Sequence, residues 1–248
     1  MLNRRLAAST LAAFLFSTAI TRDAQAASFQ AGDFVTFLQD EWGDGALSTT
    51  ASERLAAHFT DIYGTLGYAE VGTNGSGGFS ILLTSASAIF SYLPASGASA
   101  ALLADLVDPT STPAGIFGGE VLALRLNVDF SDAGYTLGSL GIPFGDLVIQ
   151  NYSPIPQVNG LTVRQVLAQA NMLLGGGATG YSIIDANALV VSLNSSFWVR
   201  PDGYFNPQFA EDHLRIGGDS VQPVPEPATL SLLGVGAAAL AIRRRSVR

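Results

Sequence analysis

The sequence contains no cysteine, and only two histidines, His58 and His213. Without cysteine no disulfide can hold the fold, so packing must do so, and no thiol is available as a nucleophile. Two histidines far apart in the sequence cannot supply a usual zinc site. A catalytic serine would need one of them as its base, and no G-x-S-x-G elbow is present. The sequence therefore predicts no catalytic residues and no zinc site.

Basic residues are also scarce. Between residues 27 and 223 there is no lysine, and five arginines face eighteen acids, a net charge of −13 with histidine neutral. A field of that sign repels nucleic acid and anionic lipid, so no nucleic-acid partner is expected. Solubility is one consequence of this charge, and attraction of divalent cations in an extracellular matrix is a second hypothesis. The arginines are Arg54, Arg125, Arg164, Arg200 and Arg215.

Two acidic loops are the places where calcium could bind. Residues 40–45 and 129–132 offer carboxylates, but neither loop matches the D-x-[DN]-x-[DN]-G pattern, and solvated turns explain them as well. No metal site is therefore predicted. Any two of the acids could instead form a glycosidase pair. Trp42 and Trp198 could be platforms for sugars, or ordinary core residues.

A glycine-rich run at residues 175–180 has the spelling of G-x-G-x-x-G. A dinucleotide site needs a strand before these glycines, whereas a predicted helix precedes them here. Tyr181 stands where a phosphate-binding loop requires lysine. The run is interpreted as a helix end and linker, and no cofactor is predicted.

The hydrophobic pattern favours an α+β fold, a helix-rich single domain with a few short strands. Capping boxes at Thr50–Glu53 and Thr162–Gln165 begin two helices, and Ser85 and Ser182 cap two more. Residues 119–130 alternate as a strand would, but their Ala and Leu content also allows a helix. The short connection between the last two helices favours an antiparallel pair. The predicted helices are 50–64, 85–93, 102–107, 162–174 and 182–197, and the predicted strands are 68–71, 79–83 and 147–150.

The N-terminus has the features of a secretory signal peptide over residues 1–26. Arg4 and Arg5 form a positive region, Leu6 to Ile20 is mostly apolar, and Ala24-Gln25-Ala26 is an A-x-A cleavage site. The mature chain is expected to begin at Ala27.

The C-terminus has three parts over residues 224–248, after an irregular stalk predicted for residues 201–223. Pro225-Glu226-Pro227 disfavours helix, Ala228 to Ile242 carries no charge, and Arg243, Arg244 and Arg245 follow. Arginines after an apolar run indicate a cytoplasmic tail. The apolar run is shorter than the roughly 20 residues of a full span, so it predicts a marginal membrane helix.

This order resembles the PEP-CTERM sorting signal of Gram-negative exoproteins. The resemblance implies an exosortase as partner, cleavage near Pro225-Glu226-Pro227, an inner-membrane intermediate, and a final place at the cell surface or outside the cell. A permanent anchor is the alternative. The central part is also similar to a segment shared among such exoproteins, which implies no activity. The residues that carry this second likeness are 84–86, 88–94, 121–124, 126–128, 147–149 and 171–176.

Together these features predict a globular α+β domain at residues 27–200 that is exported and processed. The expected function is that of a non-enzymatic surface or matrix protein associated with exopolysaccharide. The alternative is a secreted polysaccharide hydrolase that uses paired carboxylates, for which two acids with raised pKa values in one cleft would be the distinguishing feature.

Overall fold

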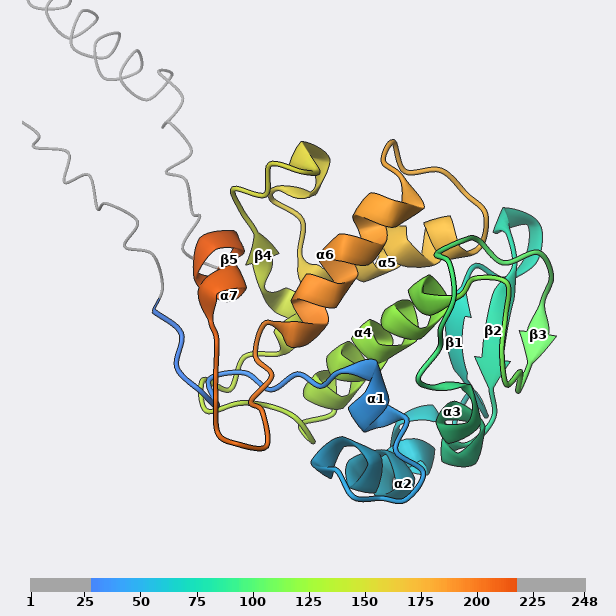
Figure 1. The fold of residues 1–248 in the computed structure, drawn as a ribbon, viewed down its shortest axis with the longest axis horizontal. Coiled ribbons are helices and arrows are strands. Elements are labelled where there is room, and N and C mark those ends of the chain that lie inside the picture. Colours follow the sequence, from blue (N-terminus) through green and yellow to red (C-terminus); the bar gives the residue numbers. More distant parts are fainter. Residues whose placement is uncertain (1–27, 218–248) are drawn as a thin grey trace, which may run out of the picture.

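The computed structural model describes residues 28–217, which form a helix-rich α+β fold, as predicted (Figure 1). The predicted signal peptide and C-terminal membrane helix lie outside these residues. Among the described residues no helix has the length and hydropathy needed to cross a membrane. The helices are α1 Gln39–Trp42, α2 Thr50–Tyr63, α3 Ala86–Tyr92, α4 Ile116–Asp132, α5 Val163–Leu174, α6 Ile183–Ser195 and α7 Gln208–His213. The strands are β1 Ala69–Gly72, β2 Ser80–Leu83, β3 Leu106–Val107, β4 Val148–Ile149 and β5 Leu214–Arg215.

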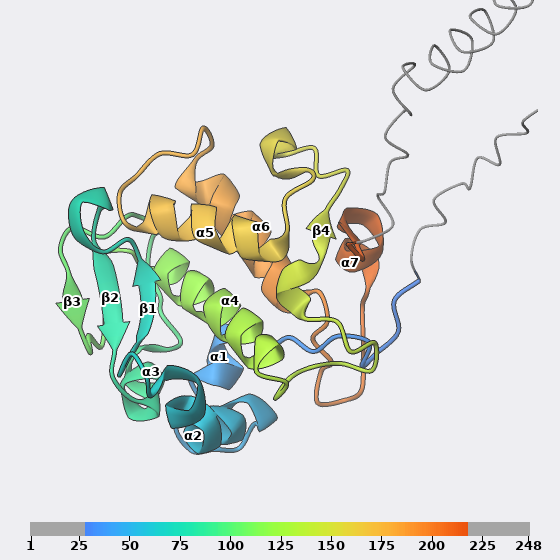
Figure 2. The same ribbon diagram turned by 180° about the vertical axis from the view of Figure 1, so that it is seen from behind.

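Helix α4 is the centre of the fold. It crosses the middle of the molecule, with α5 and α6 on one side, α1 and α2 on another, and the β1–β2–β3 sheet at one end (Figures 1 and 2). Thirteen of its 17 residues are buried. At its start, a Cβ on Gly118 would collide with the Tyr92 hydroxyl, and one on Gly119 with the Gln39 side chain. The two glycines therefore allow neighbouring elements to approach α4 closely.

The position of α4 explains why the sequence left residues 119–130 ambiguous. These residues are helical, so the strand suggested by their alternation is wrong. A helix buried on nearly every side needs apolar residues all round, and so loses the 3.6-residue period of a surface helix. What remained in the sequence was an incidental alternation of Leu or Val with smaller or polar residues.

The helix predicted over residues 102–107 is also wrong. Leu106 and Val107 form β3, which pairs in parallel with Ile81 and Leu82 of β2. The loop before β3 is held by the carboxylate of Asp105, which accepts from the Ser80 amide at 2.8 Å. Leu103 and Val107 are 73% and 64% exposed, so the leucine spacing that resembled a helix face does not correspond to a buried stripe.

Most predicted helix starts are confirmed. Ser85 and Ser182 cap α3 and α6, and Thr162 forms the predicted capping box with Gln165 on α5. The start of α2 is shifted by one residue, because Thr49 is its cap and pairs with Ser52 rather than Thr50 with Glu53. The Thr49 hydroxyl also donates to the carbonyl of Glu41 at 2.7 Å, which links the start of α2 to α1.

The predicted strands are present within one or two residues. β1 and β2 are antiparallel, with Ala69 opposite Leu83 and Val71 opposite Ile81. These four side chains are fully buried, so one face of the sheet contributes to the core. The two strands are connected by a glycine-rich segment at residues 73–78.

The prediction of an irregular stalk from residue 201 is wrong, because the chain remains part of the fold up to Gly217. α7 packs on the domain, and β5 pairs with β4 through Val148–Arg215 and Ile149–Leu214. Ala210 and Leu214 are fully buried. Prolines and glycines dominated the sequence pattern there, while the few apolar residues that anchor the segment were too widely spaced to show a period.

Candidate functional site

A buried polar network joins α1, α4 and α6. The carboxylate of Glu120 accepts from Gln39 Nε2 at 2.9 Å and from Asn194 Nδ2 at 2.8 Å. Asn194 Oδ1 accepts in turn from Asn127 Nδ2 at 3.0 Å. Asn127 and Asn194 are fully buried and Glu120 is 7% exposed. Each member has hydrogen-bond partners, which is the condition for polar groups to be tolerated in a core.

Burial raises the pKa of Glu120 above its ordinary value, and nearby Asp40 adds a smaller electrostatic contribution in the same direction. The amides of Asn194 and Gln39 oppose this rise because they donate to the charged form. Both carboxylate oxygens are therefore engaged inside the protein. This geometry fits a structural role that holds three helices together.

Glu41 on α1 is a second acid whose pKa burial raises. The Trp198 indole and the Leu38 amide, whose nitrogen lies 3.2 Å from Glu41 Oε2, lower this pKa in part. The indole lies close to the carboxylate, but its N–H does not reach hydrogen-bond geometry. Burial also raises the pKa of Asp129 on α4, and the paired Arg125 opposes this rise. Of these three acids with raised pKa values, Glu120 is enclosed in the core and Asp129 is paired with arginine.

Three carboxylates in the acidic loops considered for calcium already bind other groups of the protein. Asp44 accepts from the amides of Ala46 and Ser48 and forms a local turn. Asp129 binds Arg125 at 2.5 Å, and Asp132 binds Arg164 at 2.5 Å. Across residues 28–217 no group of three or more His, Cys, Asp or Glu side chains is placed to hold a metal ion.

The two histidines lie on α2 and α7 and have different surroundings. His58 Nδ1 lies 2.9 Å from Asp61 Oδ2, and its ring stacks on Tyr135 with centroids 3.8 Å apart. His213 makes edge and tilted ring contacts with Tyr152 and Phe209. Within the described chain neither histidine is hydrogen-bonded to a serine, so no Ser-His-Asp arrangement is formed there.

The two tryptophans separate clearly into core and surface roles. Trp42 is fully buried, and its Nε1 donates to Asn127 Oδ1 at 3.2 Å. Trp198 is partly exposed and lines a hollow of about 280 Å³ between the end of α6 and the start of α7. We call this the α6–α7 hollow; its lining residues are Ser195, Ser196, Trp198, Arg200, Tyr204, Asn206 and Phe209.

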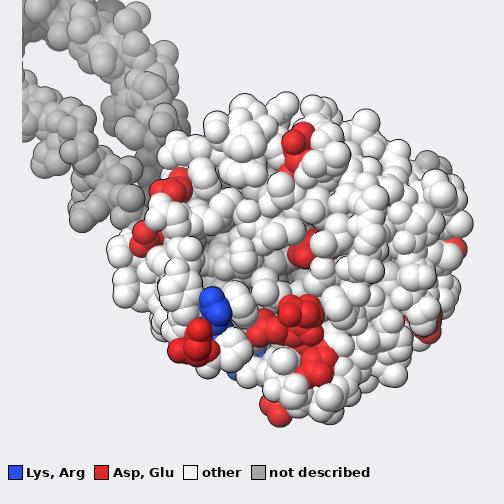
Figure 3. Space-filling view, in the orientation of Figure 1, with Lys and Arg blue, Asp and Glu red and all other residues white. Residues whose placement is uncertain are grey.

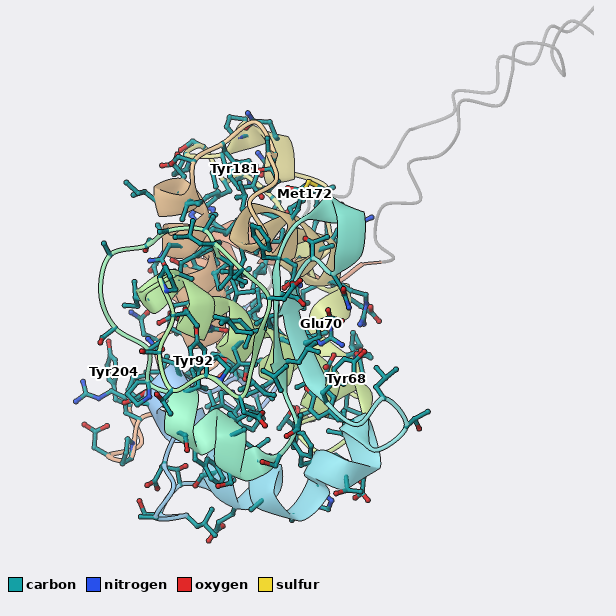
Figure 4. All side chains as sticks on the ribbon, turned by 90° about the vertical axis from the view of Figure 1, so that its right-hand side faces the viewer. Tyr68, Glu70, Tyr92, Met172, Tyr181 and Tyr204 are labelled. Atoms are coloured by element: carbon teal, nitrogen blue, oxygen red, sulfur yellow. The ribbon has the colours of Figure 1, made fainter. Side chains whose placement is uncertain are left out.

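A short turn shapes one wall of the α6–α7 hollow. Val199 and Phe205 form an antiparallel bridge, and the Arg200 amide donates to the Tyr204 carbonyl at 2.9 Å. Gly203 has a φ of +82°, which glycine adopts without strain. Arg200 lies over the Tyr204 ring, 5.7 Å from its centroid. Figure 4 shows Tyr204 at the margin of the domain, on the side opposite Tyr68.

The sequence did not reveal this hollow, because its wall falls in the segment interpreted as an irregular stalk. One signal was present: aromatic residues at positions 198 and 204 flank Pro201-Asp202-Gly203, a combination typical of a tight turn.

The residues predicted for processing all lie outside residues 28–217, so the signal peptide remains a prediction. They are Ala24, Ala26, Pro225–Pro227 and Arg243–Arg245.

The C-terminal segment is identified by comparison with known families. Residues 223–245 match the family described as the PEP-CTERM protein-sorting motif. This chain carries a PEP-CTERM sorting motif. The motif implies an exosortase-targeted protein that is exported through the membrane to the cell surface, and it follows shortly after the last described residue, Gly217. No curated protein and no solved structure matches the chain.

Proposed function

We propose that the protein is a non-catalytic surface or extracellular-matrix component that associates with exopolysaccharide after an exosortase has removed its C-terminus. The PEP-CTERM motif at residues 223–245 is the observation that carries this proposal. The folded chain continues to Gly217, so the cleavage site follows the domain almost directly. Cleavage near Pro225–Pro227 would release or display the whole of the domain.

Two structural features support a role without catalysis. Glu120, one of the acids with a raised pKa, directs both oxygens into a network of amides. Asp129 and Asp132 are each paired with arginine. A glycosidase needs two carboxyl groups that face one bound sugar across a cleft, whereas these carboxyl groups are engaged with other side chains of the protein.

The processing step can be tested in the host cell. We expect the mature protein to lack residues 230–248, and replacement of Pro225, Glu226 and Pro227 by alanine to leave full-length protein in the inner membrane. An extended backbone beside the membrane would be accessible to a protease, and alanines would favour helix there. Immunoblotting of membrane and surface fractions, with mass spectrometry of the C-terminus, measures both outcomes.

The control is Gln222→Ala, which changes a residue just outside the matched motif at residues 223–245 and should leave processing intact. Deletion of Arg243–Arg245 should weaken retention, so that some protein escapes uncleaved. Surface protein that still contains its C-terminal arginines would show that the tail is a permanent anchor. Association with exopolysaccharide is tested separately, by whether the processed protein co-fractionates with the purified polymer.

A further inference from the structure

We propose that the α6–α7 hollow binds a neutral hexose unit of a polysaccharide. This inference rests on the proposed association with exopolysaccharide and gives it a site and a ligand class. It is carried by three properties of the hollow: its aromatic wall, polar atoms with unused hydrogen-bonding capacity within residues 28–217, and the sign of the surrounding charge. At about 280 Å³ the hollow lies just below the roughly 300–1,000 Å³ of typical pockets for drug-sized ligands and cofactors, a size that suits a single sugar unit.

The aromatic wall offers a flat apolar surface to one face of a sugar ring. Tyr204 is 56% exposed, an unusual state for a large aromatic side chain, and Trp198 and Phe209 also line the hollow. Arg200 over its ring restricts the orientations of Tyr204. Ring contacts with Tyr152 and His213 hold Phe209 in place. A partly preorganised aromatic wall loses little conformational entropy when a ligand covers it.

Polar groups around this wall are available for hydroxyl groups. Asn206 Oδ1 accepts from the Gln208 amide at 3.1 Å, but its Nδ2 makes no hydrogen bond in the described chain. The Ser195 hydroxyl donates to the Ser192 carbonyl at 3.1 Å, which leaves its oxygen free to accept. A donor and an acceptor beside aromatic rings match a sugar, which has an apolar C–H face and hydroxyl groups around its edge.

The charge near the hollow favours a neutral sugar over an anionic one. Arg200 is the basic residue in the lining, and Asp202 lies 3.5 Å from its guanidinium and partly neutralises it. Glu41 lies beside Trp198. Acidic side chains predominate on the face shown in Figure 3, with a basic patch beside some of them. An anionic sugar such as a uronic acid would be repelled by this field.

The experiment uses the processed protein recovered from its host and follows tryptophan fluorescence. Trp42 is sealed in the core, so a change of emission on adding ligand reports Trp198. The probes are neutral hexasaccharides of glucose, mannose and galactose, with hexagalacturonate as the anionic comparison. We expect at least one neutral probe to shift the emission, and hexagalacturonate to bind more weakly at low salt. Trp198→Phe should abolish the emission change.

Affinity electrophoresis in gels that contain the host exopolysaccharide then compares two tyrosine variants. Tyr204→Ala should weaken retardation about ten-fold, since an exposed aromatic anchor is lost. Tyr68→Ala removes a tyrosine on the opposite side and should leave retardation unchanged. If Tyr204→Ala is retarded like the unmodified protein, the hollow is not the site although the association stands. If the unmodified protein is not retarded at all, the proposed association is itself wrong. Equal or tighter binding of hexagalacturonate would overturn the neutral-sugar assignment alone.

Discussion

The network around α4 and the α6–α7 hollow contrast within one small fold. In the network, Asn127 makes four hydrogen bonds: its Oδ1 accepts from the Phe37 amide and the Trp42 indole, and its Nδ2 donates to the Phe37 carbonyl and to Asn194. In the wall of the hollow, Trp198 Nε1 is buried without a hydrogen-bond partner in residues 28–217, and so is Nδ1 of His213, which packs on Phe209 of the hollow.

The difference indicates a division of roles. A fully satisfied network in a dry interior stabilises one arrangement of the helices, because any other arrangement would leave polar groups unpaired. Exposed aromatic and amide groups add little to stability but are available to a ligand. Changes in the network should therefore alter stability, and changes in the hollow should alter binding.

The largest expected effect is that of Asn127→Ala. The variant leaves the Phe37 amide and the Trp42 indole without their acceptor, and it removes a donor to Asn194. We expect a loss of about 3 kcal/mol or more in the free energy of unfolding, since each stranded buried group costs about 1–3 kcal/mol. Urea unfolding followed by circular dichroism measures it.

The control for this prediction is Asn206→Ala in the hollow. Asn206 loses only its bond from the Gln208 amide at the start of α7, so we expect about 0.5–1 kcal/mol, as for a helix cap. Equal losses in the two variants would break the distinction between a stabilising network and a binding surface.

A smaller effect should come from the ionisation of Glu120. Burial raises its pKa in the folded protein, so the folded state retains a proton that the unfolded chain releases. Its contribution to stability is fully present below the unfolded pKa of about 4.3 and is lost as the pH rises through the folded pKa. Relative to Glu120→Gln, which does not titrate, the unmodified protein should therefore gain stability as the pH falls from 7 towards 4.

The measurement for Glu120 is the denaturant midpoint of both proteins at several pH values. Asp40 is the charged neighbour that also acts on this carboxyl group, and Asp40→Asn should reduce the pH dependence without removing it. A constant difference between the unmodified protein and Glu120→Gln from pH 7 to 4 would show that the Glu120 pKa is not raised.

The smallest expected effect is that of calcium. In the two acidic loops, Asp129 and Asp132 are held by arginines and Asp44 by a local turn, and residues 28–217 contain no group of three or more acids or histidines placed to hold a metal ion. We expect calcium to raise the melting temperature no more than NaCl at the same ionic strength, because both would act by screening repulsion between acids. A shift of several degrees specific to calcium, seen by calorimetry, would show a site that this geometry does not explain.

Local signals in the sequence were sufficient for several elements. Ser85, Ser182 and the Thr162–Gln165 pair predicted three helix starts, because caps act on amides only two or three residues away. Strands β1 and β2 were predicted from two short apolar runs, and the structure pairs them antiparallel. The sorting motif could be recognised for the same reason, since its proline, apolar and arginine parts are contiguous.

The candidate site could not be predicted in the same way. Residues 198–217 carry no regular period, and α7 and β5 are placed by a few anchors such as Ala210 and Leu214 against distant parts of the chain. Asn127, Asn194 and Glu120 likewise show no sign in the sequence that they meet, because each lies among apolar residues of its own helix.

The sequence by itself determined the sorting motif and the starts of three helices, α3, α5 and α6, since both depend on contacts or recognition within a short stretch. Only the tertiary structure decided that residues 119–130 form a buried helix, that residues 106–107 pair as a strand, and that residues 198–209 enclose a hollow. Each of these depends on burial or hydrogen bonds between residues distant in sequence, and those long-range contacts outweigh the local preferences from which a pattern is read.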